Sequence, residues 1–130
     1  MTYELLIRES HLDTFGHMNN ATYLDLFEEA RWELITNNGY GLKKIRETGL
    51  GPVILEINLE FKKEIRLRER IRIETECLDY TGKVSTIEQR MINEKGEVCC
   101  RAKFVFGLFD LKARKLVSPT PDWLKAVGKG

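Results

Sequence analysis

The stretch from Asp13 to Tyr23 reads Asp-Thr-Phe-Gly-His-Met-Asn-Asn-Ala-Thr-Tyr and joins a polar loop to an amphipathic segment. Either Asn19 or Asn20 can cap a helix, because its side chain can accept a hydrogen bond from a first-turn N–H group. Downstream, apolar positions recur every three or four residues until Asn37-Asn38-Gly39, which predicts a long helix that stops there. Its apolar stripe comprises Leu24, Phe27, Ala30, Arg31 and Leu34, with Tyr23 and Leu26 beside it.

The rest of the chain alternates apolar and polar residues, which is typical of strands with one buried face. A first strand is expected before the helix, at residues 3–9. Later strands are expected at residues 53–61, 70–80, 84–93 and 97–111, joined by short polar turns. No βαβ rhythm appears, which argues against a parallel doubly wound sheet. The residues therefore predict an α+β fold, an antiparallel sheet with one long helix on one face.

Three finer expectations accompany this fold. Val53, Leu55, Ile57, Leu59 and Phe61 alternate strictly with polar residues and predict one buried face for their strand. A helical turn is expected at residues 42–47. A short tail helix is expected at residues 123–127, where Asp122 can provide the cap.

Composition favours one domain over residues 1–130, with 42% apolar residues and a net charge of +1. This charge balance gives no general attraction to nucleic acid or membranes. Charge comes too early in the chain for a signal peptide, and no apolar run approaches the roughly 20 residues of a membrane span. One central helix leaves sheet edges and loop surface that need partners, so a homo-oligomer is expected.

The cysteines are Cys77, Cys99 and Cys100, an odd number with one adjacent pair. This is a poor disulfide framework and favours a reducing cytoplasm. The adjacent pair also lacks the spacing of metal ligands, so neither a metal nor a cofactor is expected.

Asp13 is the only carboxylate between Glu9 and Asp25. We expect its loop, near Phe15, to be partly desolvated, so that Asp13 could act as a general base or as a nucleophile. The alternative is a loop aspartate that caps a turn. Free N–H groups at the helix start could stabilise an oxyanion, although every helix has such an end. With Gly16 in a sharp turn, the carboxylate and these donors could face one carbonyl group.

Other polar residues near this stretch allow two interpretations. His17 is a candidate polar contact or acid, or a structural loop histidine. Glu28 lies on the helix flank and is either solvated or within reach of the loop. Ser10, His11 and Asp13 are the residue types of a catalytic triad, but no G-x-S-x-G elbow is present, so a triad is rejected.

A basic run occupies the corner between two expected strands. It can be a solvated hairpin with local ion pairs or a clamp for phosphate. No basic-aromatic signature of an RNA-binding sheet accompanies it, so nucleic acid is not expected. The run comprises Lys62, Lys63, Arg66, Arg68, Arg70 and Arg72.

Together these residues resemble the signature of hotdog-fold acyl-CoA thioesterases of the 4-hydroxybenzoyl-CoA thioesterase type, over essentially the whole chain. The resemblance implies a sheet wrapped around a central helix, and hydrolysis of acyl-CoA to a carboxylic acid and coenzyme A. The matching pattern is Asp13-x-x-Gly16-His17-x-Asn19-Asn20-x-x-Tyr23-x-x-x-x-Glu28-x-Ala30-Arg31.

The resemblance also implies roles for single residues. Asp13 matches the catalytic carboxylate, as nucleophile or general base, and the backbone N–H of Asn20 matches the donor to the thioester carbonyl. Glu28 matches a helix carboxylate that orients the loop and is a second candidate base. His11 stands where many members have another aspartate, a change expected to alter the basicity of Asp13 or the acyl preference rather than the reaction type. Gly16, His17, Asn19 and Tyr23 are expected to shape the loop and the helix start.

Partners follow from the same resemblance. Members act as homodimers with sites between subunits, often paired into homotetramers, and bind coenzyme A phosphates near the sheet corner, here Lys62, Lys63 and Arg66. The substrate is an acyl-CoA or an acyl carrier protein thioester. Three alternatives stay open: a non-catalytic module that binds acyl-CoA or acyl carrier protein, a hotdog dehydratase, and a structural interaction domain.

Overall fold

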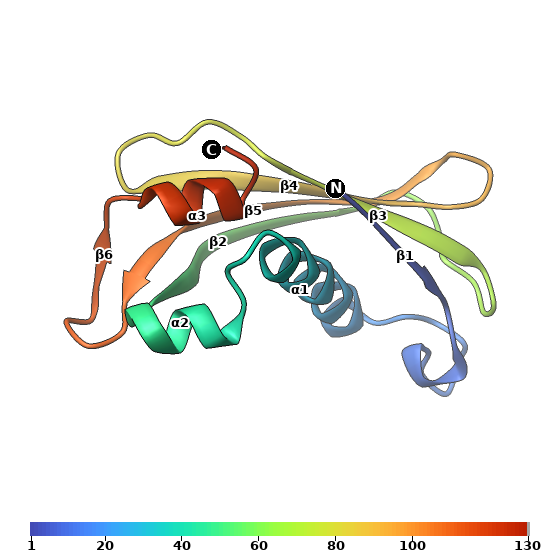
Figure 1. Cartoon of the computed structure of the whole chain (residues 1–130). Coiled ribbons are helices and arrows are strands. Elements are labelled where there is room, and N and C mark those ends of the chain that lie inside the picture. Colours follow the sequence, from blue (N-terminus) through green and yellow to red (C-terminus); the bar gives the residue numbers. More distant parts are fainter. Residues whose placement is uncertain (130) are drawn as a thin grey trace.

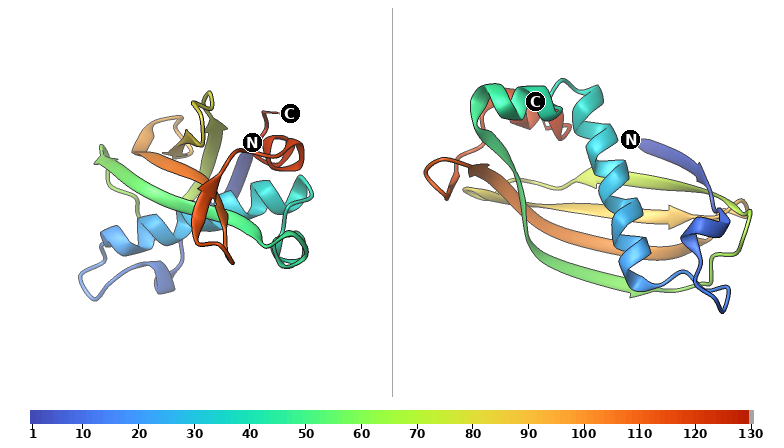
Figure 2. Two further views of the ribbon diagram at one scale, coloured as in Figure 1. Left: turned by 90° about the vertical axis from the view of Figure 1, so that its left-hand side faces the viewer. Right: turned by 90° about the horizontal axis from the view of Figure 1, so that it is seen from below.

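The computed structural model describes residues 1–129 and contains one six-stranded antiparallel sheet with helices beside it. The strand order is β1-β3-β4-β5-β2, and β6 pairs with β5. Figure 1 shows α1 beneath the sheet, and Figure 2 shows it running across the strands. The predicted α+β arrangement is therefore confirmed. In chain order the elements are β1 (Thr2–Leu6), η1 (Glu9–His11), α1 (Asn20–Asn37), α2 (Leu42–Thr48), β2 (Leu50–Phe61), β3 (Arg70–Cys77), β4 (Val84–Ile92), β5 (Val98–Asp110), β6 (Lys115–Val117) and α3 (Pro121–Ala126).

Helix α1 begins and ends where its sequence predicted. Asn19 is the N-cap, and its Oδ1 accepts a hydrogen bond from the Thr22 N–H at 3.1 Å. The helix ends at Asn37, and Gly39 follows with a φ of 91°, which costs glycine no steric strain. The predicted stripe is confirmed except that Leu24 and Arg31 are only half-buried and Ile35 joins it.

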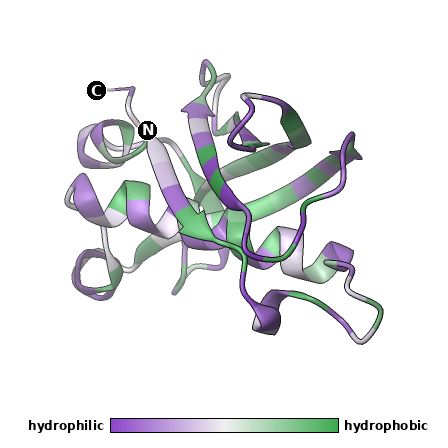
Figure 3. Ribbon diagram, turned by 90° about the vertical axis from the view of Figure 1, so that its right-hand side faces the viewer, coloured by the Kyte–Doolittle hydropathy of each residue, from purple (hydrophilic) through white to green (hydrophobic). Residues whose placement is uncertain are grey.

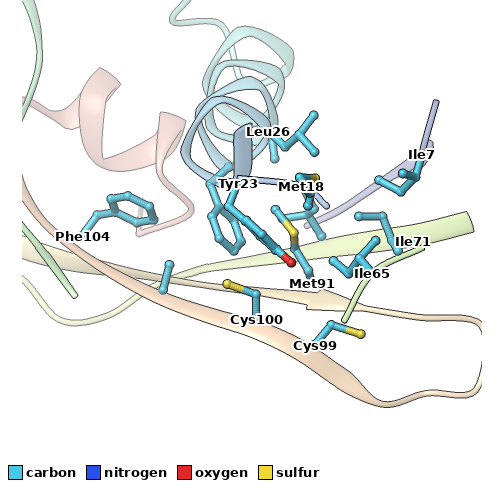
Figure 4. Close-up of a cluster of buried hydrophobic side chains, with 14 residues drawn as sticks. Ile7, Met18, Tyr23, Leu26, Ile65, Ile71, Met91, Cys99, Cys100 and Phe104 are labelled. Carbon is cyan, nitrogen blue, oxygen red and sulfur yellow. The ribbon is translucent and has the colours of Figure 1, made fainter. Parts of the chain in front are cut away.

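The main core lies between α1 and the sheet. Figure 4 shows Tyr23 extending from α1 toward Cys100 and Met91 on the strands. Phe27 packs edge-to-face on Phe104, with ring centroids 5.9 Å apart. In Figure 3 hydrophobic and hydrophilic bands alternate along the strands, as expected for a sheet with one buried face. This core fixes where the start of α1 sits over the sheet.

A second cluster of buried side chains occupies the other end of the sheet, near α2 and α3. Trp123 of α3 contacts Tyr40 edge-to-face at a centroid distance of 5.1 Å. Its indole N–H also donates a hydrogen bond to the Tyr80 hydroxyl at 2.6 Å. The C-terminal helix is thereby fixed beside the end of α1.

Strand β2 differs from its prediction. A β-bulge between Ile54 and Glu56 shifts its register against β5. As a result Ile54 packs against the core, and Leu55 is 49% exposed. Ile57 and Phe61 lie on the face that carries α1, but they are 48% and 56% exposed, because the edge of the sheet extends beyond the helix. The expectation of one buried face was therefore wrong for a single chain.

Smaller corrections concern the ends of the chain. The first strand ends at Leu6 rather than at residue 9, and β6 was not predicted, because three residues are too few for a periodic pattern. The cap of α3 is Thr120, whose Oγ1 accepts from the Trp123 N–H at 3.2 Å. Asp122, predicted as the cap, instead pairs with Lys44 at 2.8 Å.

The three cysteines are free thiols inside the protein. Burial raises the pKa of the Cys100 thiol to about 12, because the thiolate would lose its hydration. They therefore serve as small core side chains. Within residues 1–129, no helix is both long and apolar enough to cross a membrane.

Candidate active site

The loop from Asp13 to His17 is closed by a set of short hydrogen bonds. The Asp13 N–H donates to the His17 carbonyl oxygen at 2.8 Å. The Asp13 Oδ1 accepts from the backbone N–H of Phe15 at 2.9 Å and of His17 at 3.0 Å. Gly16 has a φ of 79°, which a residue with a side chain rarely adopts. Asp13 thus caps the turn, as the structural alternative predicted, and this cap fixes its carboxylate in place.

The Asp13 side chain is exposed, so the expected partial desolvation was wrong for a single chain. Phe15, which was expected to shield it, is 85% exposed. Only one carboxylate oxygen holds the loop, since Oδ2 makes no hydrogen bond within residues 1–129. Oδ1 of Asp13 therefore stabilises the loop, and Oδ2 is available to a substrate or to water.

The N-terminus of α1 offers backbone donors next to this loop. The side chain of Asn19 accepts from the Thr22 N–H, and that of Asn20 accepts from the Ala21 N–H at 3.0 Å. The backbone N–H groups of Asn19 and Asn20 themselves have no acceptor in the described part of the chain. The helix gives these N–H groups a partial positive environment. They can donate to an oxygen on which negative charge develops.

His17 and Tyr23 support this region in different ways. The imidazole of His17 is exposed and lies 4.0 Å from the Glu64 carboxylate, beyond hydrogen-bond distance, so its backbone rather than its ring closes the loop. Tyr23 is buried and contacts Phe61 edge-to-face at a centroid distance of 5.0 Å. Burial raises the pKa of Tyr23 to about 12, so the phenol stays protonated.

Glu28 makes no hydrogen bond to the loop within the described residues and lies about two helical turns from Asn20. It lines a cavity of about 170 Å³ between α1 and the sheet. The expectation that Glu28 orients the Asp13 loop therefore has no contact to support it in this chain. Other residues around the cavity include Arg31, Trp32, Ile35, Ile54, Phe106 and Trp123.

A buried polar cluster beneath α1 was missed by the sequence analysis. Gln89 is completely buried, and its Nε2 donates to the Phe27 carbonyl oxygen and to the Thr75 hydroxyl, both at 3.0 Å. Its Oε1 accepts from Arg31 Nη1 at 3.0 Å, and the guanidinium carbon lies 4.1 Å from the ring centroid of Phe104. Burial lowers the pKa of Arg31 to about 10, so the side chain remains cationic near neutral pH. The sequence feature that could have indicated this cluster was Arg31, an arginine inside the apolar stripe of the helix.

The basic residues at the β2–β3 corner have acidic neighbours, and these ion pairs are exposed. This confirms the predicted local ion pairs. Such exposed pairs contribute little to stability, because water and salt screen the charges. The pairs are Lys62 with Glu60 at 3.4 Å, Lys63 with Glu97, and Arg66 with Glu64 at 3.9 Å.

Comparison with known proteins matches this chain to one family. The model of the thioesterase-like superfamily matches residues 7–127. The chain is 29% identical to the long-chain acyl-CoA thioesterase FadM of Escherichia coli over 119 residues, which cover 91% of this chain and 89% of FadM. The matched range includes the Asp13 loop, α1 and all of the sheet except β1.

Solved structures agree with the sequence comparison. YbaW of Escherichia coli superposes with a TM-score of 0.86 and 26% identity, over 99% of this chain and 97% of YbaW. The DHNA-CoA thioesterase of Staphylococcus aureus has a TM-score of 0.84 at 24% identity, over 98% and 88% of the two chains, and is a likeness of fold. The predicted hotdog fold is therefore confirmed.

Proposed function

Because the chain belongs to the thioesterase-like superfamily, we propose that it is an acyl-CoA thioesterase. It hydrolyses an acyl-CoA to a free carboxylic acid and coenzyme A, with residues 1–130 acting as one hotdog domain. One observation supports this most directly. The Asp13 loop leads into the α1 N-terminus. One short segment therefore holds a carboxylate oxygen and the N–H of Asn20, neither of which has a hydrogen-bond partner among residues 1–129.

Asp13 is the group that acts on the thioester in this proposal. As a general base, it removes a proton from water while the water oxygen attacks the acyl carbon. As a nucleophile, its Oδ2 attacks the same carbon, and departure of the coenzyme A thiolate leaves an anhydride, which water then hydrolyses to the carboxylic acid and free Asp13. In both routes negative charge develops on the thioester oxygen, which accepts a hydrogen bond from the Asn20 N–H. The C–S bond then breaks, and its electron pair leaves with the coenzyme A thiolate.

The neighbouring residues hold this geometry. Gly16 supplies the turn, the backbone of His17 closes the loop on Asp13, and Asn19 caps the helix that presents the donor. Tyr23 fixes the first turn of α1 against β2 through Phe61. In the proposal these residues shape the site beside the thioester, and Glu28 contacts the substrate from the cavity under α1.

The phosphates of coenzyme A are placed at the β2–β3 corner, near Lys62, Lys63 and Arg66. Each of these side chains now faces a carboxylate, but exposed ion pairs are weak and exchangeable. A phosphate carries more charge and several acceptor oxygens, so it can replace these carboxylates. The same thioester chemistry applies when acyl carrier protein carries the acyl group.

We further propose that the active form is a homodimer and that dimers pair into a homotetramer. Strand β2 is last in the sheet order and is 12 residues long, which leaves one side of its backbone unpaired. Leu55, Ile57 and Phe61 are exposed along this edge. A long apolar edge strand is stabilised when another chain covers it. The free buried cysteines suit the reducing cytoplasm, where we place the enzyme.

The test of the catalytic role is Asp13→Asn. The new side-chain oxygen can accept the same N–H groups of Phe15 and His17, so the loop is retained while the negative charge is removed. We expect kcat for thiol release from an acyl-CoA panel to fall about 100- to 10,000-fold, with an unchanged thermal midpoint. Asp25→Asn is the matched control, since Asp25 is an exposed aspartate of α1, and it should keep full activity.

Three results would contradict the proposal, the first its mechanism and the other two its reaction. Unchanged turnover in Asp13→Asn would remove Asp13 from the mechanism. Binding of acyl-CoA without release of thiol would indicate a binding module. Conversion of a hydroxyacyl-CoA to its enoyl form, again without free thiol, would indicate a dehydratase.

A further inference from the structure

The cavity beside Arg31 is separate from the loop that carries Asp13. Its volume of about 170 Å³ is close to the roughly 150 Å³ that holds a benzene-sized ligand in a protein interior. Its walls are largely apolar and include Trp32, Ile54, Phe106 and Trp123. The guanidinium of Arg31 is its basic group. A small apolar moiety that carries one polar atom therefore matches this cavity better than a fully polar one.

Arg31 has hydrogen-bonding capacity that the protein does not use. A guanidinium carries five N–H donors, but among residues 1–129 this one makes a single hydrogen bond, to the amide oxygen of Gln89. Glu28, on the same cavity wall, favours its charge without forming an ion pair. The Gln89 amide and the Phe104 ring hold the guanidinium in place. It is a fixed cation with unused donors.

An apolar track leads from the start of α1 to this cavity. Phe61, Ile57 and Ile54 of β2 all lie on the face that carries α1, since each is paired with a buried residue of β5. Phe61 contacts Tyr23 in the first turn of α1, and Ile54 lines the cavity. The helix from Asn20 to Arg31 is about 16 Å long. A long acyl chain attached to a thioester at the helix start could follow this track.

We propose that Arg31 is a specificity-determining residue that binds an oxygen acceptor at the far end of a long acyl group. The acceptor is a hydroxyl, keto or carboxylate oxygen. This inference rests on the proposed function, because the chain must begin at a thioester beside Asn20. A plain alkyl end would exclude water from the unused N–H donors of Arg31 and leave them without a hydrogen bond. An oxygen atom at the end of the chain would accept a hydrogen bond from them instead. One hydrogen bond from a charged donor corresponds to a preference of roughly 10- to 100-fold.

Binding can be measured without any hydrolysis. Trp32 and Trp123 are the only tryptophans of the chain and both line the cavity, so intrinsic fluorescence reports its occupancy. The probes are S-alkyl-CoA thioethers, which lack the thioester carbonyl, of equal chain length and ending in a methyl, a hydroxyl or a carboxylate group. Comparing the hydroxyl and carboxylate probes identifies the preferred acceptor. We expect at least one of these two to bind about 10- to 100-fold more tightly than the methyl probe, and kcat/KM for the matching acyl-CoAs to follow the same order.

Arg31→Met removes the donors and keeps a long apolar side chain. The ratio of the affinities for the oxygen-terminated and methyl-terminated probes should therefore fall to about one. Should this variant unfold, Arg31→Lys keeps the charge but loses the planar donor array, and should reduce the preference severalfold. Arg46→Met, on the exposed face of α2, is the control and should bind like the unmodified protein.

Two outcomes would overturn the inference: equal or tighter binding of the methyl probe by the unmodified protein, or a preference that survives in Arg31→Met. Its failure can be told apart from that of the proposed function. Hydrolysis without any preference for oxygenated chains rejects only the role of Arg31. A fluorescence preference without any thiol release rejects only the thioesterase.

Discussion

Gln89 links α1 to the sheet, and replacing it tests whether the buried polar cluster stabilises the fold. In Gln89→Met the new side chain fills a similar volume but makes no hydrogen bonds. The bond from the Arg31 guanidinium is worth about 1.5–3 kcal/mol, and the bonds to Thr75 and Phe27 about 0.5–1.5 kcal/mol each. Added apolar burial offsets part of this loss. We therefore expect the free energy of unfolding to fall by about 3 kcal/mol.

Urea unfolding monitored by circular dichroism measures this loss, and a double-mutant cycle with Arg31→Met identifies its cause. Removing both partners leaves no buried guanidinium without an acceptor, so the double variant should be more stable than the sum of the two single losses predicts. The expected coupling is about 1.5–3 kcal/mol. A loss below about 1 kcal/mol in Gln89→Met, or strictly additive losses, would show that the hydrogen bonds of Gln89 do not stabilise the fold.

Two further predictions concern the backbone near the site and in the sheet. Asn19→Ala removes the acceptor for the Thr22 N–H, and we expect thermal unfolding to show a loss of about 1 kcal/mol; no loss would mean that another group caps α1. Gly107→Ala would place a Cβ atom 2.7 Å from the Lys83 carbonyl oxygen and 2.7 Å from Leu116 Cδ2. The same measurement should show a loss of about 1–3 kcal/mol there, and full stability would mean that both Leu116 and the Lys83 backbone move aside without cost.

Sequence reasoning succeeded where the determining contacts are local. The cap of α1 joins Asn19 to Thr22, three residues apart, and the turn at Gly39 follows from one residue's freedom, so both were predictable. The bulge of β2 was not, because an alternating pattern does not show that Leu55 is an extra residue with no partner on β5. The α3 cap was misassigned because Thr120 and Asp122 can both cap a helix. The local signal that separates them is Pro121, since proline favours the first helical position and makes the preceding Thr120 the cap.

In the candidate site, too, the residues joined by local contacts were predictable and those joined by long-range contacts were not. The loop from Asp13 to Asn20 is a continuous segment, so its residues could be identified together. The cluster around Gln89 joins α1 to two strands, and its contact with Arg31 spans 58 positions of the chain. No local pattern encodes such a contact. Glu28 was expected beside the loop, but the helix carries it to the cavity instead.

The proposed homodimer would explain why both Asp13 and the edge strand β2 are exposed in a single chain. A carboxylate and an N–H donor act most strongly on a thioester when water is excluded, because the local dielectric is then low. In a single chain Asp13 is exposed, and so are Ile57 and Phe61, although Phe61 contacts Tyr23 in the first turn of α1. A second copy along β2 would cover this apolar edge next to the helix start. The same association would stabilise the edge strand and enclose the acyl chain of the proposed substrate beside the Asp13 loop.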